Sequence, residues 1–144
     1  MRKLASLLIL SIVAVISVAC GGGADKTAGT ETGKVIKSAP AGNNLTATLA
    51  SSDGVLRKGK QNFTLKFTDA SGKPVEVGSA SLNFHMPAMG TMATMNNPAT
   101  LTTTTTPGVY SGTADLEMSG EWQAQIAYQG PAGTGKANLP ITAQ

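Results

Sequence analysis

The sequence predicts an all-β fold for residues 45–144, an immunoglobulin-like antiparallel β-sandwich of about seven strands. Apolar and polar residues alternate with a period of two over several short stretches, which is the spacing of half-buried strands. Clusters of Gly, Pro, Asn, Asp and Ser separate these stretches, as turns do. No stretch in this region has the apolar spacing of a helix. About 100 residues of this kind are enough to bury a core without disulfides or metal.

The strands are predicted in chain order from this alternation. In the first strand, Leu45, Ala47 and Leu49 share one face, with threonines between them. The fourth strand is predicted from a run of β-branched residues, and the sixth begins with Trp122, which is expected in the core. The seven predicted strands span residues 45–49, 63–67, 80–86, 101–106, 110–116, 122–128 and 137–141.

Residues 1–19 have the pattern of a secretory signal. Arg2 and Lys3 precede an uncharged apolar run that ends at Val18, and this run is short for a membrane-spanning helix. Cys20, the one cysteine of the chain, follows Ala19, and this ending resembles a bacterial lipobox. The resemblance implies that Cys20 begins the mature chain and carries a lipid. The alternative is an ordinary signal peptide that leaves a free thiol, a liability in an oxidising compartment.

The predicted location is the cell envelope, with the protein anchored to the membrane by this lipid. Gly21, rather than Asp, follows the cysteine, which resembles the signal for the outer membrane, facing the periplasm, in a double-membraned bacterium. Residues 20–44 are rich in small and polar residues and are predicted to form a flexible tether from the lipid to the domain.

Charge and composition exclude several classes of function. Removal of Arg2 and Lys3 with the signal leaves nine basic residues against eight acidic ones, a net charge near +1. Basic residues form no stripe and aromatic residues are few, so nucleic-acid binding is not expected. The chain has one histidine and no Ser/His/Asp or paired-carboxylate arrangement, so it is not predicted to be an enzyme.

The methionines are concentrated in one stretch. Met86, Met89, Met92 and Met95 recur at intervals of three, directly after His85. Pro and Gly residues argue against a helix there, and an extended, polyproline-like path would project all four from one side. If consecutive strands are antiparallel, the loops 52–60, 87–98 and 117–120 share one end of the sandwich, and Met118 lies in the last of them.

This set of side chains predicts a Cu(I) site, or an Ag(I) site of the same softness. Thioethers are soft, uncharged ligands that discriminate against hard ions, and an imidazole can complete such a set. Thioethers are also not lost to disulfide formation in an oxidising compartment. The predicted metal ligands are Met89, Met92, Met86, Met95, Met118 and His85.

Packing alone is a second explanation for some of these residues. Met86 continues the inward face of its strand, and Met118 also has inward parity, so both fit the core. His85 has outward parity and fits a solvated surface. The other three methionines lie in a polar loop with no strand face to fill, where they would form an apolar patch: Met89, Met92 and Met95.

Residues 59–125 resemble the YtkA-like domain, a family related to the FixH-type proteins. The resemblance rests on five segments: Gly59–Phe63, Asp69–Val75, the centre His85-Met86-Pro87-Ala88-Met89-Gly90, Val109–Gly112 and Leu116–Trp122. It implies an extracytoplasmic β-sandwich, often found with metal-efflux or copper-handling partners. Family members often have a histidine after the Met-Gly pair, whereas Thr91 follows here, which favours an all-thioether site.

Three functions remain open from the sequence. The first is a lipid-anchored Cu(I)-binding protein of copper handling or efflux. The second is a non-enzymatic module that docks on an efflux-pump, respiratory-complex or oxidase-assembly partner without binding metal itself. The third is a structural domain without a ligand.

Overall fold

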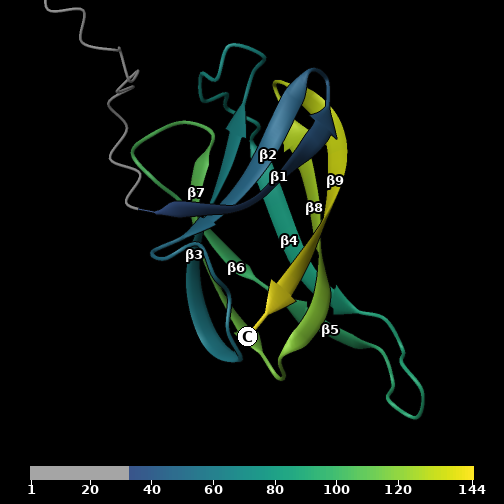
Figure 1. Ribbon diagram of the computed structural model, residues 1–144. Coiled ribbons are helices and arrows are strands. Elements are labelled where there is room, and N and C mark those ends of the chain that lie inside the picture. Colours follow the sequence, from purple (N-terminus) through teal and green to yellow (C-terminus); the bar gives the residue numbers. More distant parts are fainter. Residues whose placement is uncertain (1–32) are drawn as a thin grey trace, which may run out of the picture.

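A computed structural model describes residues 33–144 of the chain, which form two antiparallel sheets packed face to face (Figure 1). One sheet has five strands in the order β1-β2-β3-β7-β6, and the other has four in the order β5-β4-β8-β9. No helix occurs within these residues, so the predicted all-β sandwich is confirmed. The strands are β1 (Lys34–Gly42), β2 (Leu45–Ser51), β3 (Gly59–Thr68), β4 (Ser79–Met86), β5 (Met95–Pro98), β6 (Thr100–Thr103), β7 (Val109–Leu116), β8 (Gly120–Gly130) and β9 (Gly133–Ala143).

The first strand begins inside the segment that the sequence predicts to be a tether. Residues 34–42 form β1, which pairs with β2 through a turn at Asn43 and Asn44. These two residues have φ of 53° and 58°, the left-handed values that a two-residue type I′ hairpin turn requires. Ala41 is fully buried, although β1 contains few large apolar residues. Much of the stabilisation of β1 comes from backbone pairing with β2 rather than from burial of large side chains. For this reason its amino-acid composition alone predicted a tether instead of a strand. The signal 1–19, Cys20 and residues 21–32 of the predicted tether lie outside the described residues.

The predicted strand 101–106 is shorter in the structure, where β6 ends at Thr103. Thr104 leaves the sheet because its hydroxyl donates a 2.9 Å hydrogen bond to the carbonyl oxygen of Val109. The Val109 N–H in turn donates to the carbonyl oxygen of Thr106 at 3.2 Å. Threonine side chains can bond nearby backbone in this way, and here they close a turn where β-branched composition suggested a strand.

A single stretch of chain passes from one sheet to the other at Ala99. β5 pairs with β4 in the four-stranded sheet, and β6 pairs with β7 in the five-stranded sheet. Only Ala99 separates β5 from β6, and its N–H donates to the carbonyl oxygen of Leu82 at 2.9 Å. The strand β5, which the sequence did not predict, therefore continues into β6 without reversing the direction of the chain. The loops on either side of these strands keep the ends of the sandwich that strand parity predicts.

Three loops meet at one end of the sandwich, as strand parity predicts. Leu56, in the loop between β2 and β3, bridges to Ala143 at the end of β9. Gly120, which begins β8 after the loop from β7, pairs with the same Ala143. The methyl carbon of Met86, at the end of β4, lies against Gly120, 3.2 Å from where a Cβ would stand. The loop that follows Met86 therefore leaves from this end too.

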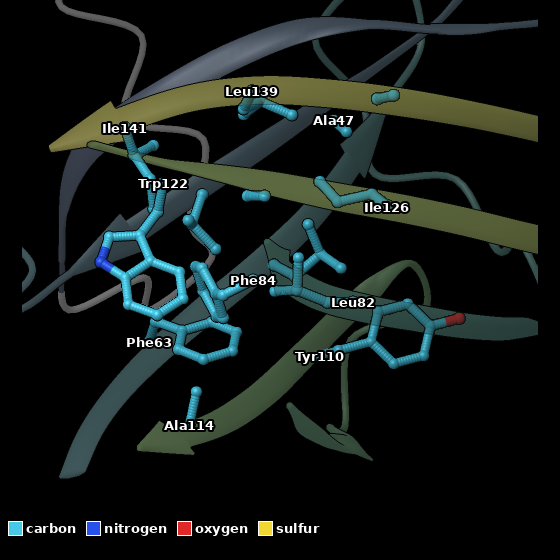
Figure 2. Packing of buried hydrophobic residues seen from close by; sticks show 14 of the residues in the cluster. Ala47, Phe63, Leu82, Phe84, Tyr110, Ala114, Trp122, Ile126, Leu139 and Ile141 are labelled. Carbon is cyan, nitrogen blue, oxygen red and sulfur yellow. The ribbon is translucent and has the colours of Figure 1, made fainter. Parts of the chain in front are cut away.

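Aromatic rings from both sheets fill the core. Phe63 of β3 meets Phe84 of β4 edge to face, with ring centroids 5.7 Å apart, as Figure 2 shows. Trp122 is 1% exposed, which confirms the burial predicted for it. Gly112 of β7 lies directly against the Phe63 ring, and a Cβ at this position would stand only 2.2 Å from a ring carbon.

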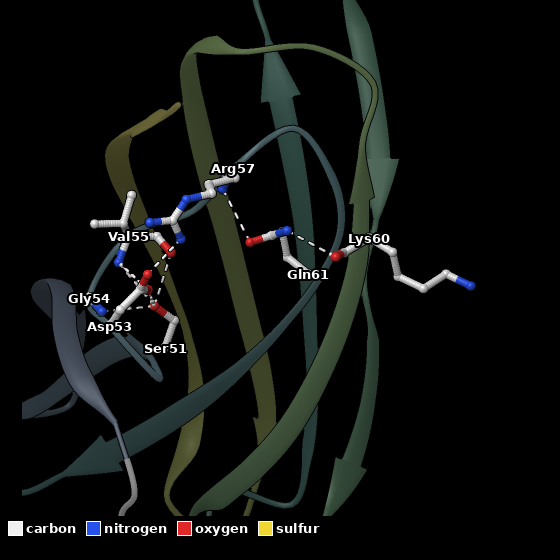
Figure 3. A network of polar contacts seen from close by, with 7 residues as sticks. All are labelled: Ser51, Asp53, Gly54, Val55, Arg57, Lys60 and Gln61. Carbon is white, nitrogen blue, oxygen red and sulfur yellow. Dashed lines mark hydrogen bonds and ion pairs between the residues drawn. The ribbon is translucent and has the colours of Figure 1, made fainter.

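A polar network stiffens the loop between β2 and β3 (Figure 3). Arg57 forms a 2.6 Å ion pair with Asp53, and the N–H of Val55 donates to the same carboxylate at 3.2 Å. The hydrogen bonds from Arg57 and then Val55 hold the pKa of Asp53 below its ordinary value. The buried hydroxyl of Ser51 accepts from the N–H groups of Gly54 and Val55 at 3.0 Å each. These bonds give the loop a defined path beside the end of β9.

Candidate metal centre

The methionine stretch forms a β-hairpin rather than a polyproline-like path. His85 pairs with Asn96 and Met86 pairs with Met95 across β4 and β5. The same register continues to an isolated bridge between Met89 and Met92, beyond a break in the ladder at Pro87, which has no backbone N–H. Figure 1 shows this hairpin projecting beyond the body of the sandwich. The four methionines are therefore two cross-strand pairs, one at the base and one at the tip.

The tip pair is defined by a two-residue turn. The N–H of Met92 donates to the carbonyl oxygen of Met89 at 2.9 Å, and the reverse bond is 3.2 Å long. Gly90 has φ +59° and is followed by Thr91 at negative φ, the pattern of a type II′ turn with glycine first. Directly opposed residues project to the same face, with their Cβ atoms about 4.5–5.5 Å apart. The two methionine side chains therefore leave the backbone as neighbours on one face, so their thioethers can approach one ligand.

These two methionines are also the most exposed ones within residues 33–144. Met89 is 54% exposed and Met92 is 39% exposed, and Val35 is the other large apolar residue exposed within residues 33–144. Neither residue belongs to the hydrophobic core or packs against it, so the core does not account for their side chains. The tip pair is thus free to contact a ligand without any loss to the core.

The hairpin contains no charged side chain that would compete with the sulfurs for a metal ion. Residues 77–114 include no Asp, Glu, Lys or Arg. The described part of the chain has no group of three or more His, Cys, Asp or Glu side chains positioned to hold a metal. A metal at the tip would therefore be selected by thioethers, which favour soft monovalent ions.

The base pair and Met118 form a separate, inward-facing group. Met86 is 3% exposed and belongs to the core, while Met95 and Met118 are half-buried and pack against it. The carbonyl oxygen of Met118 accepts a hydrogen bond from the indole of Trp122. Packing accounts for all three side chains, as the sequence suggested for Met86 and Met118.

His85 lies on the outer face of the four-stranded sheet. Its Nδ1 is 2.9 Å from Oδ1 of Asn96, which also accepts from the side chain of Asn83 at 3.2 Å. An amide oxygen only accepts, so Nδ1 of His85 carries the proton and a neutral ring leaves Nε2 as a lone-pair donor. His85 and Met89 are four positions apart, about 13 Å in extended chain. The contact with Asn96 therefore holds this imidazole at the base of the hairpin, away from the tip pair.

The structure thus brings all six predicted ligands to one end but divides them. Met89 and Met92 share the exposed tip, the other methionines face the core, and His85 stands apart on the sheet. The sequence carries a signal for this pairing, since intervals of three are symmetric about Gly90-Thr91, a possible two-residue turn.

Comparison with known proteins supports the family resemblance. Residues 40–127 match the family model described as YtkA-like, a span from within β1 to within β8 that contains the whole hairpin. No curated protein and no solved structure matches the chain. Within residues 33–144, no helix has the length and apolar character needed to cross a membrane. With more than half of its length matched by the model, the chain belongs to the YtkA-like family.

Proposed function

We propose that this protein binds Cu(I), or Ag(I) of the same softness, through the thioethers of Met89 and Met92. The single observation that supports this most strongly is the cross-strand pairing of two exposed methionines at a glycine turn. The pair lies outside the core, its two residues are directly opposed across the turn, and the hairpin around it is free of charge. Soft, uncharged donors of this kind suit a soft monovalent ion and reject hard ones.

The proposed role is binding in copper handling or efflux rather than catalysis. The protein would act outside the cytoplasm, anchored at the cell envelope by a lipid on Cys20. In a double-membraned bacterium, Gly21 favours the outer membrane, facing the periplasm. The predicted signal and the lipobox-like ending at Cys20 support this placement.

A competition titration tests the metal proposal. The wild-type chain and a Met89→Leu, Met92→Leu variant are titrated with Cu(I) under reducing conditions against a chromophoric chelator. Leucine keeps volume and apolarity but removes sulfur, and such swaps cost less than about 1.5 kcal/mol even in cores. The double variant should lose its ability to compete. Met95→Leu is the matched control, because it makes the same change one cross-strand pair away and should compete like wild type.

Equal competition by the wild type and the double variant would remove these sulfurs from the metal site. The projecting hairpin would then be a contact surface for an efflux-pump or oxidase-assembly partner, the second function that the sequence leaves open. Its position outside the body of the sandwich favours that alternative over a purely structural domain (Figure 1).

The anchoring proposal is tested separately by Cys20→Ser. This variant should leave the membrane fraction or accumulate with its signal uncleaved. A variant that stays in the membrane pellet with wild-type electrophoretic mobility would show that Cys20 carries no lipid.

A further inference from the structure

We propose that Cu(I) bridges two copies of this chain, with Met89 and Met92 of each copy as its ligands. This inference rests on the proposed function and specifies how the metal site at the hairpin tip is completed. The number of chains per metal ion is not defined by the pairing of Met89 and Met92 within one chain.

One chain offers the tip only two of the predicted donors. His85 is about 13 Å away along an extended strand, and its ring is held by Asn96. Met86 faces the core at the base of the hairpin, and Met95 and Met118 pack against that core. Cu(I) can bind more than two soft donors, so a pair of neutral thioethers leaves positions on the ion that further sulfurs can fill.

The identical tip of a second chain is a suitable source of the missing donors. A two-fold axis through the metal would relate two such pairs and surround the ion with four equivalent thioethers. Each tip is free to approach because the hairpin projects from the sandwich (Figure 1). Pro87, Ala88 and Ala93 beside the tip are small or compact, and residues 77–114 carry no charge that would repel the second copy.

The metal is required for this association of two chains. Contact between two hairpin tips involves only a few residues from each chain. Stable protein–protein interfaces bury about 1,200–2,000 Å² in total, far more than such tips provide. β5 is also only four residues long and ends in Pro98, which limits pairing along its free edge. The chains should therefore be monomeric without metal and pair only when the ion joins them.

Native mass spectrometry of the full chain, released from a mild detergent, tests this inference with Cu(I) and with redox-stable Ag(I). The metal-free protein should be monomeric, and either ion should produce a species of two chains and one ion. A chelator competition should saturate at half an equivalent of Cu(I) per chain, and competition should strengthen as protein concentration rises. Met89→Leu, Met92→Leu should abolish the two-chain species, and Met95→Leu should form it like wild type.

The outcomes separate the bridge from the metal site itself. A monomer that binds one ion through Met89 and Met92 would overturn the bridge and leave the proposed function intact. Wild-type protein that binds neither ion would overturn both. A dimer that forms without metal, or that persists in the double variant, would show that the contact does not depend on these sulfurs.

Discussion

The indole N–H of Trp122 donates a 3.1 Å hydrogen bond to the backbone carbonyl oxygen of Met118. Trp122 is buried near the start of β8, and Met118 lies in the turn that leads into that strand. The bond therefore ties the turn at the methionine-bearing end directly to the core. A tryptophan in this position supplies apolar area through its ring and fixes a loop through its one polar atom.

Replacement of Trp122 by alanine should remove most of the stability of the domain. Truncation of a large buried aromatic side chain costs about 3–5 kcal/mol, and natural domains have only about 5–15 kcal/mol in total. Denaturant unfolding followed by far-UV circular dichroism measures the loss. Trp122→Phe keeps much of the apolar volume but not the N–H and should lose less. A Trp122→Ala loss below about 0.5 kcal/mol, the range of surface positions, would contradict the core assignment.

Gly112→Ala should destabilise the protein by overpacking. The added methyl would fall within 2.2 Å of the Phe63 ring, which is held in turn against Phe84. Extra methyl groups in packed cores cost about 1–3 kcal/mol. Ser111→Ala, at the neighbouring exposed position of β7, is the control and should be close to neutral. Chemical denaturation of the double variant Gly112→Ala, Phe63→Leu should show partial recovery, since the clash is with the ring.

Alkaline pH should weaken the fold through Tyr110. Its hydroxyl donates a 2.6 Å hydrogen bond to the carbonyl oxygen of Gly78, and burial together with the nearby Glu76 raises its pKa above the ordinary 10.0. The folded state then holds this proton more tightly than the unfolded state. The stabilisation is complete below the unfolded pKa and is lost as pH rises from about 10 through the folded pKa.

Urea unfolding from about pH 8 to about pH 11 measures this effect. Tyr110→Phe loses the hydrogen bond at every pH, but its stability should fall less steeply above pH 10 than that of wild type. Glu76→Gln removes the nearby negative charge and should also reduce the slope. Parallel profiles for the wild type and Tyr110→Phe would show that Tyr110 does not contribute to the alkaline loss.

Gly90→Val should weaken metal binding more than folding. A Cβ at Gly90 meets no atom within 4 Å, so the cost arises from its φ of +59°, which valine adopts poorly. The strained turn should open locally and separate the two sulfurs, while the sandwich below it stays folded. Thr91→Val is the control at the other turn position. Cu(I) competition should weaken only for Gly90→Val, with global unfolding nearly unchanged for both. Wild-type competition by Gly90→Val would show that the turn does not organise the site.

The sequence by itself determined the features that depend on local alternation. The period of two along 122–128 and the other stretches predicts strands, an antiparallel sandwich and a buried Trp122, because half-buried strands need that pattern. Strand parity also predicts that the loops of the methionines share one end. That prediction holds even though β5 was not expected, since β5 and β6 run in one direction through Ala99.

The tertiary structure decided what depends on partners distant in sequence. β1 has too few large apolar residues to be recognised alone, and it becomes a strand because β2 offers its backbone and the core accepts Ala41. The separation of the predicted ligands into a tip pair, a core group and a surface histidine also depends on partners distant in sequence. An interval of three fits several chain paths, and only the register of β4 with β5 opposes Met89 to Met92 and places Met95 opposite Met86. Hydrogen bonding between strands sets that register, so it lies beyond the reach of local periodicity.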